Sequence, residues 1–528
     1  MADLGAGKRM ESTLQTALAS QLPEYLLRQR WFGGKARKIA SVDIVDTLSI
    51  PAGGGNAYIF VAVVHYDDGA DEFYAIPLVR SESAGVEGLK VPSPDGGSMM
   101  LADGLRNAAF LTALAQLIEK GTAIAGEHGE LRGLQTTAYS RLASEPVAVL
   151  TPKPVGAEQS NTSIIYGDRL ILKFFRRIQE GINPDLEIGQ FLTEKTSLKS
   201  VPALAGTLEY QARDGKPMSQ GMLQKFVPNQ GDAWGFTLKS LANYYDEVRK
   251  ITGTGKTAAG GVSTPGNFDT VPDSAKGSVE TYLASAELLG QRTAEMHLAL
   301  ASDASDPAFA PEPFTMDSQQ ALEQSVNRLL VRVFSLLRDK LKYLPAEWRG
   351  KAENLAERES EIAARFNTAL REPIRAMRTR IHGDYHLGQV LRTETDFVII
   401  DFEGEPARSI EERRVKRSPL QDVAGMLRSF HYAAFAPLLG EDRAAGDGVA
   451  RMGVWAEAWN SWVADRYLAK YFATAKNAPY LPATQAEIQT VLELHLLEKA
   501  IYELGYELNN RPTWVGIPLQ GIGKLLSI

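Results

Sequence analysis

The chain has 528 residues and contains no cysteine. This absence excludes disulfide bonds, thiolate metal sites and a cysteine nucleophile. The amino-terminal MADLGAGKRMESTLQ lacks the apolar core of a secretory signal peptide, and the longest apolar runs, such as YIFVAVV at 58–64, have only the length of a strand. The sequence therefore favours a cytoplasmic protein without a membrane span.

The chain also lacks an excess of positive charge. The chain carries 57 Lys and Arg against 64 Asp and Glu, which gives a formal net charge of −7, and it has no basic run. Nucleic acids and anionic membrane surfaces are usually bound through such runs, so neither is an expected partner. The hydrophobic fraction of 44% and the charged fraction of 23% are typical of globular proteins, and the length predicts more than one domain.

The order of predicted elements indicates an α+β chain, because strand-like segments come first and helical segments follow. Apolar residues recur with helical spacing from about residue 280 onward. We expect an N-terminal β-rich domain at 1–95, a second strand-rich region at 96–228, a mostly helical region at 229–528 and, inside it, a Gly-, Thr- and Ser-rich loop at 251–277.

One motif carries the chemistry. In RIHGDYHLGQVLRTETDFVIIDFEGEP, residues 380–406, Asp384 precedes Gln389 by five residues, and a turn and an apolar strand then lead to Asp401. Phosphoryl transfer needs a base beside the acceptor hydroxyl and oxygen ligands for Mg²⁺. The motif predicts Asp384 as the base and the side chains of Gln389 and Asp401 as metal ligands. Glutamine offers the same neutral carbonyl as the asparagine usual in such loops, on a stem one methylene longer.

Two upstream segments offer the remaining parts of a phosphotransferase site. In the strand RLILKFF, Lys173 has apolar neighbours on both faces and needs an anionic partner, because a lone buried charge is costly. The helix start NPDLEIGQFL places Glu187 at the edge of an apolar stripe, where it can pair with that lysine. Taken alone, Lys173 can also be interpreted as a lysine of an edge strand, and Glu187 as an ordinary glutamate at the boundary of an apolar stripe. The preceding turn offers phosphate donors at Ser160, Asn161 and Thr162.

Together these motifs resemble the aminoglycoside-phosphotransferase-like kinases and, within them, the bacterial maltokinases, where the glutamine form of the loop is usual. The segment LPEYLLRQRWFGGKAR (22–37) is similar to the start of the maltokinase N-terminal cap domain. SPLQDVAGMLRSFHYAA (418–434) and EKAIYELGYELNNRPTWVGIPL (498–519) are similar to the carboxy-terminal lobe of that family. The resemblance implies a bilobal protein-kinase-like fold with an added N-terminal β-rich cap domain.

The resemblance also implies an activity. It is the ATP-dependent phosphorylation of maltose at its anomeric hydroxyl to maltose 1-phosphate, with ATP and Mg²⁺ as cofactors, in a route from trehalose to glycogen and other α-glucans. By position, Asp384 is the base, Lys173 contacts phosphate with Glu187 as its partner, and Asp422 supports the catalytic loop. The implied metal ligands are Gln389, Asp401 and Glu403, and the implied adenine-binding hinge comprises Gln224, Phe226 and Val227.

The sugar site rests on aromatic and planar polar residues of the tail. Candidates are Tyr502, Arg511 and Trp514, together with His386 beside the base. Tyr506 reads equally as a core residue.

Two alternatives stay open. A kinase of the same fold acting on glucosamine or another amino sugar needs carboxylates for the ammonium group, and Glu503 or Glu507 could serve. A catalytically silent binding partner of glucan enzymes is disfavoured by the presence of Lys173, Asp384 and Asp401 together. An association with a trehalose-converting enzyme is also left open.

Overall fold

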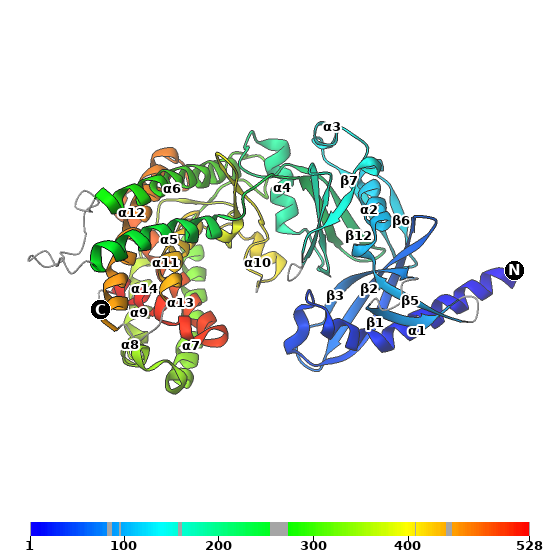
Figure 1. Cartoon of the computed structure of the whole chain (residues 1–528), viewed down its shortest axis with the longest axis horizontal. Helices are drawn as coiled ribbons and strands as arrows, with labels where there is room; N and C mark the ends of the chain where they lie inside the picture. The colour runs from blue at the N-terminus through cyan, green and yellow to red at the C-terminus, as the bar shows by residue number, and fades with distance from the viewer. Residues whose placement is uncertain are drawn as a thin grey trace, which may run out of the picture. The chain divides into compact units, whose positions relative to one another are not determined.

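The computed structural model describes residues 2–81, 87–93, 97–156, 161–253, 273–406, 408–439 and 446–526. The chain forms two compact units. The first comprises Met1–Lys195, Pro202–Pro228 and Arg408–Glu412, and the second comprises Thr196–Val201, Asn229–Ala407 and Arg413–Ile528. Figure 1 shows that the first unit holds the two large sheets, whereas helices make up most of the second. The predicted division of the first unit at residue 95 stays a prediction.

The N-terminal sheet has the strand order β1-β2-β3-β5-β4, and the short β11 pairs with β3. Gly53 and Gly54 form the two-residue turn between β1 and β2, with φ of 58° and 86°, which suits the primed turns of tight hairpins. Helix α1, Ala2–Arg28, packs Leu22 and Leu26 against this sheet. The strands are β1 Ile39–Ala52, β2 Gly55–Tyr66, β3 Glu72–Ser81, β4 Gly88–Pro92, β5 Ser98–Asp103 and β11 Arg177–Ile178.

A seven-stranded sheet follows, with the order β6-β7-β12-β13-β10-β9-β8. Helix α2, Ala108–Lys120, starts at the Asn107 side-chain cap and ends at Gly121 in the left-handed conformation. Apolar residues of α2, of the N-terminal sheet and of this sheet form one core, so the two sheets are joined. The strands are β6 Ala123–Ala125, β7 Gly129–Gln135, β8 Pro152–Pro154, β9 Asn161–Tyr166, β10 Leu170–Phe175, β12 Leu204–Ala212 and β13 Pro217–Lys225. The short helices are η1 Gly33–Ala36, η2 Gly104–Arg106, α3 Tyr139–Leu142, η3 Val147–Val149 and α4 Pro184–Lys195.

The second unit is built around α11, Leu420–Phe435, which is buried along nearly its whole length. Its remaining helices are α5 Ala233–Gly253, α6 Asp273–Leu300, α7 Met316–Lys340, η5 Leu341–Tyr343, α8 Ala346–Ala356, α9 Glu359–Ala369, η6 Leu387–Gln389, η7 Ala436–Leu439, α12 Gly446–Thr474, α13 Gln485–Asn510, η9 Pro512–Trp514 and α14 Gly516–Leu526. Helix α10, Ile410–Arg414, has residues in both units. Two small two-stranded sheets complete this unit. One pairs β14 Glu312–Pro313 with β15 Met377–Arg378, and the other is a hairpin of β16 Val390–Arg392 and β17 Phe397–Ile399.

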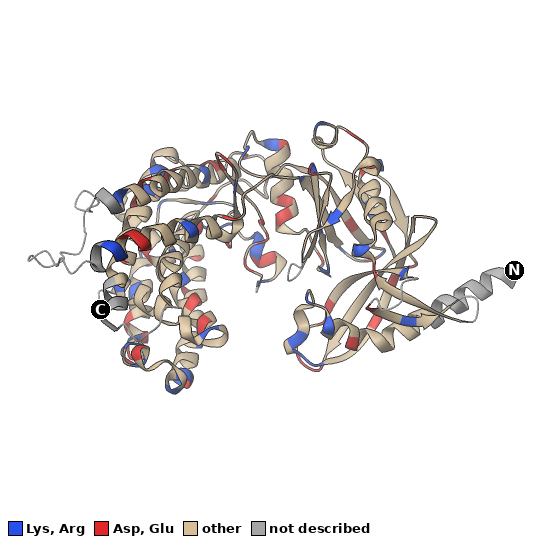
Figure 2. Cartoon of the chain, in the orientation of Figure 1, with Lys and Arg blue, Asp and Glu red and all other residues tan. Residues whose placement is uncertain are grey.

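Helices occupy both ends of the segment predicted as a loop at 251–277. Helix α5 extends to Gly253 and α6 begins at Asp273, while residues 254–272 lie outside the described part of the chain. Figure 2 shows Lys and Arg interspersed with Asp and Glu over both units. Among the described residues, no helix combines the length and the apolar character that a membrane crossing requires.

Candidate active site

The predicted catalytic loop is held by one buried carboxylate. Asp422, in the first turn of α11, is 2% exposed, and its Oδ2 and Oδ1 accept hydrogen bonds from the backbone N–H groups of His382 (2.7 Å) and Gly383 (2.9 Å). The His297 ring also lies 3.1 Å from Oδ2. Burial by itself would raise the pKa of Asp422, but the hydrogen bonds from His297 and Gly383 outweigh it and lower that pKa. The predicted support of the loop by Asp422 is confirmed.

The catalytic loop lies directly against the segment that follows β17. His382 Nε2 lies 2.9 Å from the carbonyl oxygen of Ile400, and the His382 ring packs on Phe402. Gly383 has a φ of 85°, and a Cβ at this position would come within 3.2 Å of Gly404 Cα. Only glycine suits both the left-handed backbone and this close approach. The contacts of His382 with Ile400 and Phe402 give this residue a structural role in the loop.

The two predicted metal ligands are brought together. The side-chain NH₂ of Gln389 donates to Asp401 Oδ2 at 2.9 Å, and the backbone N–H of Ile400 donates to the backbone carbonyl oxygen of Gln389 at 3.0 Å. Asp401 has a φ of 68°, a left-handed conformation that costs a residue other than glycine about 1 kcal/mol or more. A carboxylate beside an amide carbonyl is the kind of oxygen donor set that suits Mg²⁺. Glu403, two residues on and half-buried, stays a predicted ligand.

We expect the substitution Gln389→Asn to keep measurable Mg²⁺-dependent turnover, reduced by about tenfold, because asparagine presents the same carbonyl on a shorter stem. Titrating Mg²⁺ at saturating substrates checks this. The loss should appear in the Mg²⁺ concentration at half-maximal rate, and Gln389→Leu, which removes the carbonyl, should lose far more. Equal loss in both variants would contradict a ligand role for the amide carbonyl.

Asp384 lies between two basic side chains. Its Oδ1 is 3.5 Å from Lys499 Nζ, and its Oδ2 is 3.9 Å from His386 Nε2. Burial by itself would lower the pKa of Lys499, but Asp384 and Glu503 outweigh it and raise that pKa, so the ammonium stays charged. Burial lowers the pKa of His386, and its Nδ1 accepts from the Gly388 N–H at 3.0 Å. The neutral ring therefore carries its proton on Nε2, on the side of Asp384.

Lys499 was not predicted as a site residue, although its helical spacing from two tyrosines could have indicated it. It lies on α13 three residues before Tyr502 and seven before Tyr506, a spacing that places all three on one face of a helix. Tyr506 is 48% exposed, so its interpretation as a core residue is wrong. Lys499 Nζ lies 5.0 Å from the centre of the Tyr502 ring, and the Tyr502 hydroxyl donates to Glu405 at 2.9 Å. The predicted sugar residue Tyr502 is thus close to the predicted base.

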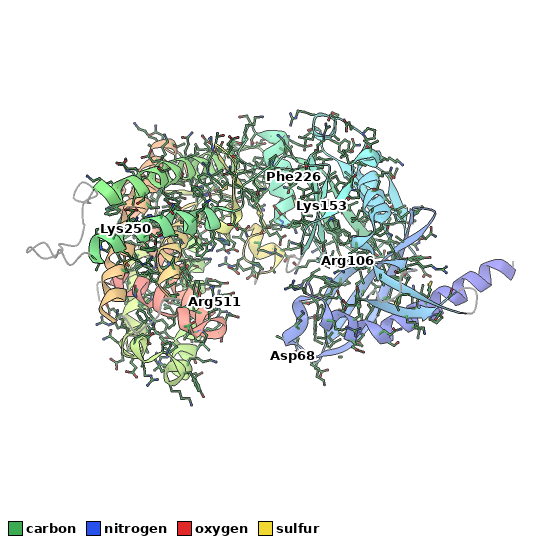
Figure 3. All side chains as sticks on the ribbon, in the orientation of Figure 1. Asp68, Arg106, Lys153, Phe226, Lys250 and Arg511 are labelled. Atoms are coloured by element: carbon green, nitrogen blue, oxygen red, sulfur yellow. The ribbon has the colours of Figure 1, made fainter. Side chains whose placement is uncertain are left out.

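Two further predicted sugar residues, Arg511 and Trp514, lie near Glu507 at the end of α13. Arg511, labelled in Figure 3, donates to the Glu507 carboxylate at 2.7 and 3.0 Å, and the Tyr432 hydroxyl donates to it at 3.1 Å. The Arg511 guanidinium also lies 4.4 Å from the centre of the Trp514 ring. One turn earlier, Glu503 accepts a hydrogen bond from Nε of the buried Arg428 at 2.8 Å, and a terminal nitrogen of this arginine lies 2.7 Å from the same carboxylate oxygen. The wall formed by Tyr502, Arg511 and Trp514 combines aromatic faces with planar polar groups.

In the first unit, the predicted lysine pairs with a carboxylate other than the predicted one. Lys173 Nζ lies 3.1 Å from Asp185 Oδ2, and Asp185 is almost fully buried in the first turn of α4, where the Asn183 side chain caps its N–H. Strand β10 lies between β13 and β9, so the interpretation of Lys173 as an edge-strand lysine is wrong. Pairing by Asp185 reflects which side of the first turn faces the sheet. The contact with Glu187 stays a prediction.

The predicted donor turn is only partly described. Ser160 lies outside the described residues, and Asn161 and Thr162 begin β9, where they pair with Phe175 and Phe174 of β10. Both are half-buried. Their hydroxyl and amide groups stay predicted phosphate donors.

The predicted hinge follows β13. Gln224 lies in that strand, opposite Ile171 of β10, and the N–H of Phe226, labelled in Figure 3, donates to the carbonyl oxygen of Arg169 at 2.7 Å. This N–H is therefore already used within the sheet. Any adenine contact at the hinge has to involve other groups, such as the backbone of Val227.

Two segments of the chain match known protein families. Residues 25–92 match the maltokinase N-terminal cap domain, and residues 271–459 match the phosphotransferase enzyme family. A glucosamine kinase of Streptacidiphilus jiangxiensis is 24% identical over 374 residues, which cover 70% of this chain and 69% of that protein. A glucosamine kinase of Mycolicibacterium smegmatis is also 24% identical, over 71% of this chain and 79% of its own length.

Among solved structures, a glucosamine kinase in complex with glucosamine, ADP and inorganic phosphate matches with a TM-score of 0.62 at 18% identity, over 97% of this chain and 99% of the other. This likeness confirms the predicted α+β kinase-like fold. The matched family segment, 271–459, contains Asp384, Gln389 and Asp401. The chain therefore combines a segment that matches the maltokinase N-terminal cap domain with a segment that matches the phosphotransferase enzyme family.

Proposed function

We propose that the chain is an ATP-dependent kinase that phosphorylates maltose at its anomeric hydroxyl, giving maltose 1-phosphate and ADP. The observation that carries the phosphotransfer chemistry is the arrangement of the loop 382–389, in which Asp384 lies between Lys499 and His386 while Gln389 contacts Asp401. The family match supports the same chemistry. The choice of maltose rests on the way in which Glu503, Glu507 and Lys499 are paired.

Each residue has a role in this proposal. Asp384 accepts the proton of the acceptor hydroxyl and orients its oxygen toward the γ-phosphate. Neutral His386 donates from Nε2 to a sugar oxygen beside that hydroxyl. Gln389 and Asp401 hold Mg²⁺, with Glu403 as a further ligand, and the ion when bound offsets the negative charge of the phosphates. Lys173, held by Asp185, binds phosphate oxygens of ATP.

The pairing of the nearby carboxylates Glu503 and Glu507 favours a neutral sugar over an amino sugar. Glu503 is paired with the buried Arg428, and Glu507 with Arg511 and Tyr432. Burial raises the pKa of Glu507, although Arg511 opposes the change. An ammonium group would have to displace a guanidinium to reach either carboxylate. The charged Lys499 beside Asp384 would also repel it near the reacting hydroxyl.

A specific observation nevertheless supports glucosamine as a second candidate. The relatives and the solved structure reported above are glucosamine kinases. In this chain Glu405 accepts from the Tyr502 hydroxyl, and an amino group could reach this carboxylate without displacing Arg428 or Arg511. We therefore expect Glu405→Gln to lower glucosamine turnover more than maltose turnover if both sugars are accepted.

The test is an ATP-consumption assay with Mg²⁺ and, in turn, maltose, glucose, glucosamine and trehalose, with the product identified by ³¹P NMR. We expect turnover with maltose and an acid-labile anomeric phosphate. Turnover with glucosamine alone would leave the catalytic roles intact and overturn the choice of sugar. Nucleotide binding without turnover on any of the four would favour the silent binding partner instead. If maltose is the substrate, a trehalose-converting enzyme and an α-glucan-forming enzyme are the expected neighbours in the reaction sequence.

A further inference from the structure

A buried arginine in the first unit has partners in both of its sheets. Arg176 is 2% exposed and follows β10, the strand that carries Lys173. Its guanidinium donates from one terminal nitrogen to Asp103 Oδ2 at 2.7 Å and from Nε to Thr162 Oγ1 at 3.1 Å. One planar cation therefore connects the N-terminal sheet to the first residues of β9.

The partners on the side of the N-terminal sheet are themselves fixed. Asp103 ends β5 and caps η2, where its other carboxylate oxygen accepts from the Leu105 N–H at 3.1 Å; Arg106, labelled in Figure 3, marks the end of this short helix. The Trp31 ring, 7% exposed, lies 4.7 Å from the guanidinium carbon. These contacts hold the guanidinium plane by charge and by stacking.

The backbone joins the same two sheets at this point. The carbonyl oxygen of Arg176 accepts from the Ala75 N–H of β3 at 2.8 Å, and the next two residues form β11, which pairs with β3. The chain therefore leaves β10 and enters the N-terminal sheet without a loop. A displacement of that sheet is transmitted directly to β10 and, through the side chain of Arg176, to Thr162.

We propose that Arg176 is a positioning residue through which the cap domain fixes Thr162 for nucleotide binding. The inference rests on the proposed function and on the prediction from the sequence that Thr162 donates to a phosphate of ATP. Because Nε–H donates to Oγ1, the hydroxyl proton of Thr162 is directed away from Arg176 and is available to an acceptor. The charge of Arg176, 2% exposed, is balanced by Asp103, so the cap sets both the place and the orientation of this donor.

A purely structural arginine would also be buried and paired, so the experiment has to separate the two roles. The first variant, Asp103→Asn, keeps an oxygen that can cap η2 but removes the charge opposite Arg176. The second, Thr162→Val, removes only the hydroxyl. The third combines both substitutions. The conservative Arg176→Lys keeps the charge and loses the planar Nε–H donor. MgADP binding is measured by titration calorimetry, KM for ATP and for sugar by steady-state kinetics, and the midpoint of thermal unfolding in parallel.

The control is Arg37→Lys. Arg37 lies over the Tyr66 ring, donates to the carbonyl oxygens of Asp68 and Ala70, and has all of these partners within the N-terminal sheet and its turns. The substitution Arg37→Lys should lower the midpoint of thermal unfolding without changing the affinity for MgADP.

We expect Asp103→Asn and Thr162→Val each to weaken MgADP binding and raise KM for ATP by about tenfold, with KM for sugar changed less than about twofold. The double variant should be little worse than either single one, because both changes break the same connection. Lowered thermal stability with unchanged nucleotide affinity, or fully additive losses, would overturn the positioning role. No MgADP binding by the unaltered chain would contradict the proposed function itself, and with it this inference.

Discussion

We expect the substitution Asp384→Asn to lower kcat for sugar phosphorylation by about 10³-fold while MgADP affinity stays within about twofold. Asparagine has nearly the same shape, but its amide cannot accept the proton that leaves the acceptor hydroxyl. It also presents no charge to Lys499, whose ammonium lies 3.5 Å from the carboxylate in the unaltered chain. Single-turnover and steady-state rates at saturating ATP and sugar measure the loss, and calorimetric titration with MgADP measures binding.

Asp396→Asn is a matched control for that experiment. Asp396 lies in the turn between β16 and β17, in the same hairpin that leads from Gln389 to Asp401, and it pairs with Arg292 on α6. It has no contact with Asp384, so kcat should change less than about twofold. Retained turnover in Asp384→Asn would contradict the assignment of Asp384 as the general base. A similar loss in both variants would attribute the effect to the hairpin rather than to proton transfer.

The largest expected effect on stability belongs to Asp422. Asp422→Ala removes the acceptor of two backbone N–H groups, those of His382 and Gly383, and of the His297 ring, all within a buried site. Leaving these donors without a partner should lower the free energy of unfolding by about 3–5 kcal/mol. Urea unfolding at pH 7 followed by circular dichroism measures it. Asp246 lies on the exposed face of α5, where it pairs with the neighbouring Arg249, and Asp246→Ala should change the same quantity by less than about 0.5 kcal/mol.

The stabilisation by Asp422 depends on pH in a defined direction. The pKa of Asp422 is lower in the folded chain than its ordinary value, because the hydrogen bonds from His297 and Gly383 outweigh the effect of burial. In the unfolded chain an aspartate titrates near about 3.9. The contribution is therefore fully present above about pH 4 and is lost as the pH falls through the folded pKa. The difference in unfolding free energy between the unaltered chain and Asp422→Asn should narrow below about pH 4, and a constant difference would contradict this cause.

Sequence by itself determined the central part of the candidate site. Asp384, Gln389 and Asp401 lie within one loop and one tight hairpin, where a turn and two short strands set the distances between side chains. Local chain geometry is sufficient there, and the contact of Gln389 with Asp401 follows from the pairing of β16 with β17. The helical lobe and the strand-rich first unit were also predictable, since their apolar residues recur with different periods.

Only the tertiary structure decided which partners the charged residues have. The contact of Asp185 with Lys173 depends on how α4 is rotated against the sheet, and that rotation is set by packing and not by the two residues themselves. Lys499 reaches Asp384 because α13 packs beside α11, far along the chain from the catalytic loop. Arg176 connects two sheets because β11 joins β3. Such contacts unite residues distant in sequence, and the free energy that selects them comes from the packing of whole elements, which no local pattern encodes.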